Sequence, residues 1–321
     1  PDTTQNKVDR GKSYLRQSLY SHIEVVAPTK MSVLILGESG TGKEYIARMI
    51  HEKSNRKSAP FIAVDCGSLS MELAPSELFG HKKGSFTSAI SDKTGVFVEA
   101  NGGTVFLDEV GNLSYEVQKQ LLRALQEQKV RPVGSASDIK VDVRIIAATN
   151  EDLEKAIEEG RFRQDLYHRI NEFSVDVPPL RKRLEDIEEF AYHFVEQANE
   201  ELGKNVDTIS ADVIEALKQQ SWLGNLRELR NVIRRSVLFA QDNVLRKENL
   251  PEFLKETKKQ VAPVYVKEDT VDFSLNNKAN EKEQILAALK EARGNKTIAA
   301  KLLQIDRKTL YNKMHLYDIE L

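Results

Sequence analysis

The residues with the clearest capacity for chemistry form a glycine-rich stretch that could bind phosphate. It reads Gly37-Glu38-Ser39-Gly40-Thr41-Gly42-Lys43-Glu44. An apolar run typical of a buried strand precedes it, and helical apolar spacing follows it. Glycines let the backbone wrap an anion, so that main-chain N–H groups face the phosphates while Lys43 adds charge near the β and γ groups. An ordinary turn is the alternative, but the G-x-x-x-x-G-K spacing between strand and helix favours nucleotide binding. Glu44 departs from the general motif, in which Ser or Thr holds Mg²⁺.

Two adjacent carboxylates provide a second component of a phosphoryl-transfer site. Asp108 and Glu109 end an apolar run that begins at Gly103. Asp108 could hold Mg²⁺ directly or through water, and Glu109 could orient and deprotonate the attacking water. A carboxylate pair after a strand is by itself a common surface feature. Together with the phosphate-binding loop it indicates an ATPase.

Arginines could provide the third component, which is cationic stabilisation of the γ-phosphate. Arg161, Arg163 and Arg169 lie within nine residues, and an arginine from this cluster could reach the nucleotide of a neighbouring subunit. A solvated basic face is the alternative. Arg227, at the start of a later helical stretch, could read the γ-phosphate in cis and couple hydrolysis to domain movement. For Arg227 the alternative is a surface salt bridge with Glu228.

A parallel sheet would bring these groups together. Four apolar runs alternate with helical stretches: Val33 to Leu36, Phe61 to Val64, Gly103 to Leu107 and Val141 to Thr149. This order predicts an α/β fold with a mostly parallel sheet, whose ligands bind at the carboxyl ends of the strands. The polar residues at those ends should therefore converge on one site, and they include Asp65, Asp108, Glu109 and Asn150.

Composition limits the class of protein. The chain has 321 residues, 40% hydrophobic and 30% charged, which is typical of a globular protein of two or three domains. The formal charge of -2 requires any nucleic-acid surface to be local. A single cysteine excludes an internal disulfide, and the sequence shows neither a signal peptide nor a long apolar run, so we predict a cytoplasmic protein without a membrane span. Pro1 in place of Met indicates a fragment of a longer protein.

Changes of pattern along the chain predict four parts. Residues 1–177 would form the α/β ATPase subdomain, 178–250 an all-helical lid, 251–278 a linker and 279–321 a small helical domain. The last part is locally basic, with seven Lys or Arg against two acidic residues between Lys290 and Leu316. Its three helical stretches and a turn near Ile305 indicate a helix-turn-helix. The final helix would present these residues to double-stranded DNA: Arg307, Lys308, Thr309, Asn312 and Lys313. A helical cap with a solvated basic face is the alternative.

These motifs resemble those of the sigma-54-dependent transcriptional activators, which are NtrC-like AAA+ ATPases also called bacterial enhancer-binding proteins. The resemblance covers nearly the whole chain and rests on Gly37 to Glu44, Ser76 to His81, Gly102 to Glu109, Phe162 to Arg169, Pro178 to Arg181 and Gly224 to Leu229. It implies a AAA+ P-loop fold with a helical lid and a Fis-type helix-turn-helix. It also implies ATP and Mg²⁺ as cofactors, a homo-oligomeric ring that is usually a hexamer, and use in two-component regulatory systems. A heptameric ring is the alternative.

The resemblance also assigns roles by position. Asp108 and Glu109 match the Walker B pair, and Asn150 matches sensor I. Arg163 and Arg169 match the arginine fingers that act in trans, and Arg227 matches sensor II. Glutamate after the loop lysine is familiar in the family, so Glu44 is no defect.

Two positions depart from the family pattern. The sigma-54 contact loop G-A-F-T-G-A reads Gly84-Ser85-Phe86-Thr87-Ser88-Ala89, so Phe86 and Thr87 would contact sigma-54 while Ser88 replaces a glycine. Serine there would be strained if the position requires positive φ. Asp65 stands where the family commonly has an asparagine whose amide holds Glu109 in a resting position. An aspartate facing Glu109 would repel it, and we expect altered coupling between partner binding and hydrolysis.

The expected function is ATP-dependent activation of transcription. The protein would bind an enhancer-like palindrome upstream of a promoter and use ATP hydrolysis to remodel sigma-54 RNA polymerase. One alternative is a DNA-binding AAA+ regulator whose altered contact loop does not engage sigma-54. A second is a AAA+ DNA motor or remodelling chaperone.

Overall fold

The structure is a computed structural model that describes residues 14–87, 89–255 and separate positions between 285 and 314. It divides into two compact units, Pro1–Thr257 and Lys258–Leu321, and each is described by itself. Ser88 and the predicted DNA-contacting residues lie outside the described residues; the latter are Arg307, Lys308, Thr309, Asn312 and Lys313.

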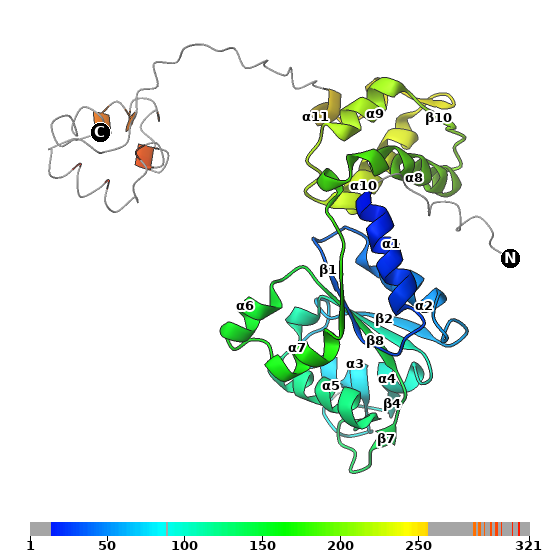
Figure 1. The fold of residues 1–321 in the computed structure, drawn as a ribbon, viewed down its shortest axis with the longest axis vertical. Helices are drawn as coiled ribbons and strands as arrows, with labels where there is room; N and C mark the ends of the chain where they lie inside the picture. The colour runs from blue at the N-terminus through cyan, green and yellow to red at the C-terminus, as the bar shows by residue number, and fades with distance from the viewer. Residues whose placement is uncertain are drawn as a thin grey trace. The chain divides into compact units, whose positions relative to one another are not determined.

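The first unit alternates strands and helices and then becomes helical (Figure 1). Its α-helices are α1 (Tyr14–Val26), α2 (Lys43–Glu52), α3 (Ala74–Phe79), α4 (Val96–Glu99), α5 (Tyr115–Glu127), α6 (Leu153–Glu158), α7 (Gln164–Ile170), α8 (Ile187–Leu202), α9 (Ala211–Lys218), α10 (Asn225–Phe239) and α11 (Glu252–Lys255). Its strands are β1 (Val33–Leu36), β2 (Phe61–Asp65), β3 (Gly80–His81), β4 (Lys93–Thr94), β5 (Thr104–Asp108), β6 (Lys129–Val130), β7 (Ile139–Lys140), β8 (Arg144–Thr149), β9 (Phe173–Asp176), β10 (Thr208–Ile209) and β11 (Val244–Leu245).

The central sheet is parallel, which confirms the predicted fold class. Its five strands follow the order β2-β5-β8-β1-β9. Strand β8 begins at Arg144, later than the predicted Val141, because the ladder starts opposite Thr104 where β5 begins. Strand β9 was not predicted. It is an edge strand in which only Val175 is fully buried, so it lacks the continuous apolar run that marks the inner strands.

Helices cover both faces of this sheet. Residues of β1 alternate between the faces: Val33 and Ile35 pack with α1 and α2, while Leu34 packs with the helices on the other side. The second face is covered by α3 to α7 (Figure 1). Burial on both sides explains why β1, β5 and β8 read as apolar runs.

The helical lid has its own core. Its buried residues come from α8, α9, α10 and α11, and Trp222 lies among them with its indole N–H donating to the Leu217 carbonyl at 2.7 Å. Leu250 and Leu254 belong to the same core. Helix α10 carries Arg227 in its first turn, next to the phosphate-binding loop.

The second unit also has a small apolar core. Its buried members are Ile285, Ala288, Leu289, Ala292, Ala299, Ala300, Leu303, Leu310 and Met314. The spacing of the first four is that of one helical face, as the sequence predicts. In the part of the chain that the structure describes, no helix has the length and apolar character needed to cross a membrane.

Candidate nucleotide-binding site

The motifs from separate strands meet around one cavity of about 470 Å³. The phosphate-binding loop follows β1, whereas Asp108 ends β5, two strands away in the sheet, and Glu109 follows it. Arg227 enters the cavity from the lid. Parallel strands place their carboxyl ends at one edge, which is why the loop and the carboxylate pair meet here although they are distant in the sequence.

Left-handed backbone shapes the phosphate-binding loop. Gly40 has a φ of 78° and Gly42 a φ of 96°, values that favour glycine. Gly42 is also the N-cap of α2, so the first N–H groups of that helix follow the loop directly. A Cβ on Gly40 would lie 2.4 Å from the Gly224 carbonyl oxygen, so the lid backbone approaches the loop as closely as glycine allows.

Lys43 lies buried at the centre of the loop. Its Nζ donates to the Gly37 carbonyl at 2.9 Å and to the Glu38 carbonyl at 3.1 Å. Burial lowers the pKa of Lys43, and the charges of Asp108 and Glu109 oppose that shift. Both hydrogen-bond acceptors are neutral, so the ammonium charge remains available to an anion in the cavity.

The carboxylate pair is held at a strained strand end. Asp108 accepts the Glu109 backbone N–H at 3.0 Å. Glu109 has a φ of 52°, which is unusual for a residue other than glycine. Its Oε2 accepts the Asn112 side-chain amide at 3.0 Å. The Asp108 carboxylate is therefore oriented by the backbone N–H of the next residue, whereas the Glu109 carboxylate is oriented by the side chain of Asn112, one turn further along the chain.

Glu38 connects the loop to the junction with the lid. Arg181 donates to both carboxylate oxygens, at 2.7 and 2.5 Å, and Asn225 donates to Oε2 at 3.2 Å. These hydrogen bonds, Arg181 first, lower the pKa of Glu38 from 4.5 to about 2. Buried Asn225 also donates to the Ser39 carbonyl at 3.1 Å and accepts the Leu180 N–H at 2.8 Å.

Several residues that line the cavity were not predicted from the sequence. Arg183 is buried and donates to the Thr41 carbonyl at 3.0 Å, and its guanidinium lies 5.2 Å from the centre of the Phe190 ring. Tyr20 and Phe194 also line the cavity. The position of Arg183, two residues after the Pro178 to Arg181 motif, was the one available signal. The aromatic residues resemble ordinary core positions in the sequence.

Six predicted nucleotide-site residues lie outside the cavity lining: Gly37, Glu38, Asp65, Asn150, Arg163 and Arg169. Asn150 follows β8 and has an exposed side chain. Arg163 forms an ion pair with Asp165 at 2.7 Å and lies over the Tyr115 ring, 5.0 Å from its centre. Arg169 forms an ion pair with Glu172 at 2.8 Å. The predicted action of both arginines on a neighbouring subunit stays a prediction.

The predicted contact loop folds onto itself. Gly84 donates its N–H to the Ala89 carbonyl at 2.8 Å, and Ala89 donates to the Phe86 carbonyl at 2.9 Å. The Phe86 ring is half-buried and meets the His81 ring edge-on, with 4.9 Å between the ring centres. Thr87 is exposed.

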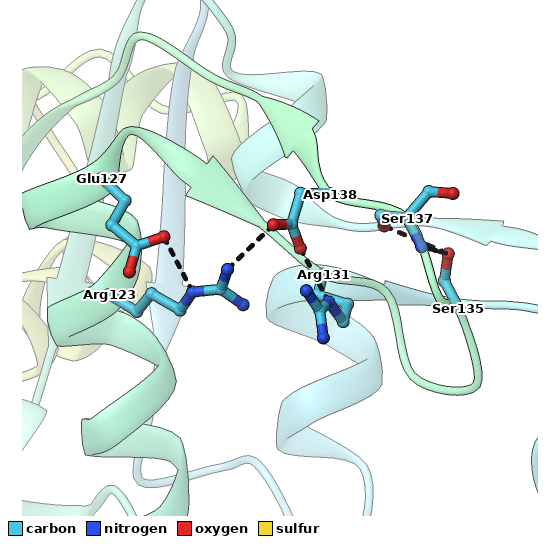
Figure 2. Close-up of polar contacts among 6 residues, drawn as sticks. All are labelled: Arg123, Glu127, Arg131, Ser135, Ser137 and Asp138. Atoms are coloured by element: carbon cyan, nitrogen blue, oxygen red, sulfur yellow. Dashed lines mark hydrogen bonds and ion pairs between the residues drawn. The ribbon is translucent and has the colours of Figure 1, made fainter.

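A second loop, residues 131–138, supports the contact loop. Lys82 donates its N–H to the Val133 carbonyl at 2.9 Å, and a Cβ on Gly134 would lie 2.5 Å from the Cβ of Ser85. Figure 2 shows how Asp138 ties this loop to α5: it accepts from Arg123 at 2.8 Å and from Arg131 at 2.7 Å. Arg123 lies in the C-terminal half of α5, so this contact anchors the second loop to a helix that packs on the central sheet.

Comparison with known proteins identifies the family. The family model described as the sigma-54 interaction domain matches residues 10–176, just over half of the chain. The chain belongs to the sigma-54-dependent transcriptional regulators. Models for a AAA+ ATPase lid domain and for bacterial regulatory proteins of the Fis family match residues 181–264 and 279–317 of this regulator.

Similar proteins cover almost all of this sigma-54-dependent regulator. The nitrogen fixation protein AnfA of Azotobacter vinelandii is 46% identical over 309 residues, which are 96% of this chain and 57% of AnfA. The transcriptional regulatory protein ZraR of Escherichia coli K12 is 45% identical over 95% of this chain and 67% of ZraR. The crystal structure of NtrX from Brucella abortus in complex with ADP has 34% identity and a TM-score of 0.71, covering 97% of this chain and 70% of NtrX. The regulator thus spans from just over half to about two thirds of these relatives.

Proposed function

We propose that this chain is an ATP-driven transcription activator that remodels sigma-54 RNA polymerase. The observation that carries the proposal is the convergence of the phosphate-binding loop, Asp108, Glu109 and Arg227 on one cavity. Membership of the sigma-54-dependent regulators and the ADP complex of NtrX support ATP as the nucleotide. The proposed reaction is hydrolysis of ATP to ADP and phosphate.

The cavity fits a nucleoside triphosphate. The left-handed turns at Gly40 and Gly42 and the start of α2 form a concave backbone surface with N–H donors. Lys43 adds a buried positive charge, and Tyr20 and Phe190 provide apolar surface for a base. Mg²⁺, when bound, neutralises charge on the β and γ phosphates. We assign Asp108 as its protein ligand because Asp108 ends β5 beside the loop.

Each remaining residue has a proposed role. Glu109 orients and deprotonates the attacking water. Arg227 stabilises the γ-phosphate in cis. Asn150 senses the γ-phosphate, and the arginines at 163 and 169 act on the nucleotide of a neighbouring subunit in a homo-oligomeric ring. In this assignment the ATP site is completed only when subunits assemble.

The proposed domain organisation follows the sequence with one adjustment. We assign 1–177 to the ATPase subdomain, 178–255 to the lid and 279–321 to a helix-turn-helix that binds enhancer-like DNA. The burial of Leu254 in the lid core supports a lid that extends beyond residue 250. Phe86 and Thr87 are the proposed sigma-54 contacts.

Open-complex formation tests the whole proposal. The chain, sigma-54 holoenzyme, promoter DNA and Mg-ATP should yield promoter opening, and Glu109→Gln should abolish both hydrolysis and opening. Phe86→Ala should abolish opening while leaving hydrolysis within about twofold, because Phe86 lies on a loop outside the cavity lining. ATP hydrolysis by the unsubstituted chain without promoter opening would contradict sigma-54 remodelling.

A further inference from the structure

The carboxylates of Asp65 and Glu109 both lie next to Gly67. A Cβ on Gly67 would be 2.2 Å from Oε2 of Glu109 and 3.3 Å from Oδ1 of Asp65. Two carboxylates this close to one another each need a donor, because like charges otherwise repel. Asp65 Oδ1 accepts the Gly67 backbone N–H at 2.9 Å.

The donor to Glu109 is the amide of Asn112. Its Nδ2 lies 3.0 Å from Oε2 of Glu109, and its backbone N–H also donates to the Glu109 carbonyl at 2.9 Å. Both hydrogen bonds close the short 3₁₀ turn Val110–Asn112, which starts from the left-handed Glu109. The turn therefore fixes the direction of the Glu109 side chain as well as its backbone.

The strand order shows toward which side of the sheet the Glu109 side chain is directed. Gly67 follows β2, and β2 lies on the opposite side of β5 from β8 and β1. The phosphate-binding loop follows β1. A Glu109 carboxylate held beside Gly67 is thus drawn toward the β2 side of Asp108 and away from β1, whose following loop leads to Lys43 at the start of α2.

We infer that Asn112 is a positioning residue that holds Glu109 in a resting orientation, a role that residue 65 cannot fill in this chain because aspartate lacks an amide donor. The inference rests on the proposed role of Glu109 in ATP hydrolysis. Release of the Asn112 hydrogen bond lets Glu109 turn toward the γ-phosphate side, so the contact sets the basal hydrolysis rate. Asn112 itself touches neither water nor nucleotide in this assignment.

Steady-state ATP hydrolysis by the full chain tests this inference. Asn112→Ala should raise kcat about threefold to tenfold, the effect expected for losing one ordinary solvent-exposed hydrogen bond, with KM changed less than about twofold. Asn112→Asp should raise kcat similarly, because it replaces the donor with a like charge. A merely structural role would instead lower kcat or raise KM.

Gly67→Ala provides an independent route to the same change. Its Cβ would lie 2.2 Å from Glu109 Oε2, which is too close for both atoms, so the carboxylate would be displaced. The double variant with Asn112→Ala should be no faster than the faster single variant, since both free the same side chain. Asn55→Ala is the matched control: Asn55 is an exposed asparagine whose Nδ2 donates to the Pro28 carbonyl at 3.1 Å, and its loss should leave kcat unchanged.

The outcomes separate this inference from the proposed function. Unchanged or reduced kcat in both Asn112 variants, with Glu109→Gln inactive, would overturn the inference and leave the proposed function standing. An unsubstituted chain without ATPase activity, or Glu109→Gln at full rate, would overturn the proposed catalytic role and the inference with it. Circular dichroism melting of each variant identifies any loss of folding. If the Asn112 variants fail to fold, the kcat of Gly67→Ala decides between the outcomes.

Discussion

The guanidinium of Arg227 lies 2.9 Å from the hydroxyl oxygen of Ser39, so a lid side chain touches the phosphate-binding loop directly. The contact is reinforced by the backbone, because the N–H groups of Leu226 and Arg227 donate to the Gly40 carbonyl at 2.9 and 3.3 Å. The first turn of α10 is therefore seated on the loop that would hold the phosphates. Movement of the lid must change the position of Arg227 and the loop together.

Arg227→Ala should lower kcat for ATP hydrolysis about hundredfold, the usual cost of removing one donor to developing charge. Arg234→Ala is the matched control, because Arg234 lies on the same helix and pairs with Glu201 at 2.9 Å on the exposed surface. Phosphate-release assays on both variants provide the measurement. Equal rates for the two variants would exclude a catalytic role for Arg227.

Glu38→Gln should lower the free energy of unfolding near neutral pH, and this difference from the unsubstituted chain should disappear in acid. Folding lowers the pKa of Glu38 from 4.5 to about 2, so its contribution to stability is complete above about pH 4.5 and disappears as the pH falls toward 2. The midpoint of urea unfolding should differ between the unsubstituted chain and the variant at pH 6, and the difference should shrink at pH 3. A difference that grows on acidification would contradict a stabilising contact between Arg181 and the ionised Glu38 carboxylate.

Lys43→Ala should inactivate the ATPase, whereas Glu44→Ser should be tolerated. Lys43 is buried in the loop, and its loss should abolish nucleotide binding or hydrolysis. Glu44 pairs with Arg48 at 2.7 Å on the exposed face of α2, a contact worth about 0.5 kcal/mol or less. Isothermal titration with ATP and a hydrolysis assay measure both changes. Complete inactivity of Glu44→Ser would mean that this side chain has a role at the metal.

Arg144→Met should destabilise the ATPase subdomain by about 3 kcal/mol, because three carbonyls would lose a charged donor and two of these hydrogen bonds are buried. Arg144 donates to Met31, Ala27 and Val26 at 3.1, 2.7 and 2.9 Å and so ties the end of α1 to β8. Burial lowers the pKa of Arg144 to about 10, and the group stays charged at neutral pH. Thermal melting should show the loss, while Arg246→Met, on an exposed pair with Asp242, should melt like the unsubstituted chain.

Much of the site could be predicted because its parts are local. Strand β1 and the phosphate-binding loop occupy consecutive positions, so apolar runs and glycine spacing reveal them directly. Asp108 and Glu109 were found for the same reason, since they end a continuous apolar strand. Strand β9 was missed because a short edge strand with one buried residue has no such run.

The sequence by itself determined the types of chemical group and the order in which strands and helices carry them. Only the tertiary structure decided their partners. Glu38 and Arg181 are 143 positions apart, and no local spacing predicts their ion pair. Likewise, the sequence showed that Asp65 departs from the family pattern. It did not show that the amide that donates to Glu109 belongs to Asn112, at the end of a turn whose direction depends on strand order. Side-chain contacts across strands and subdomains follow from packing, and packing is a property of the whole fold.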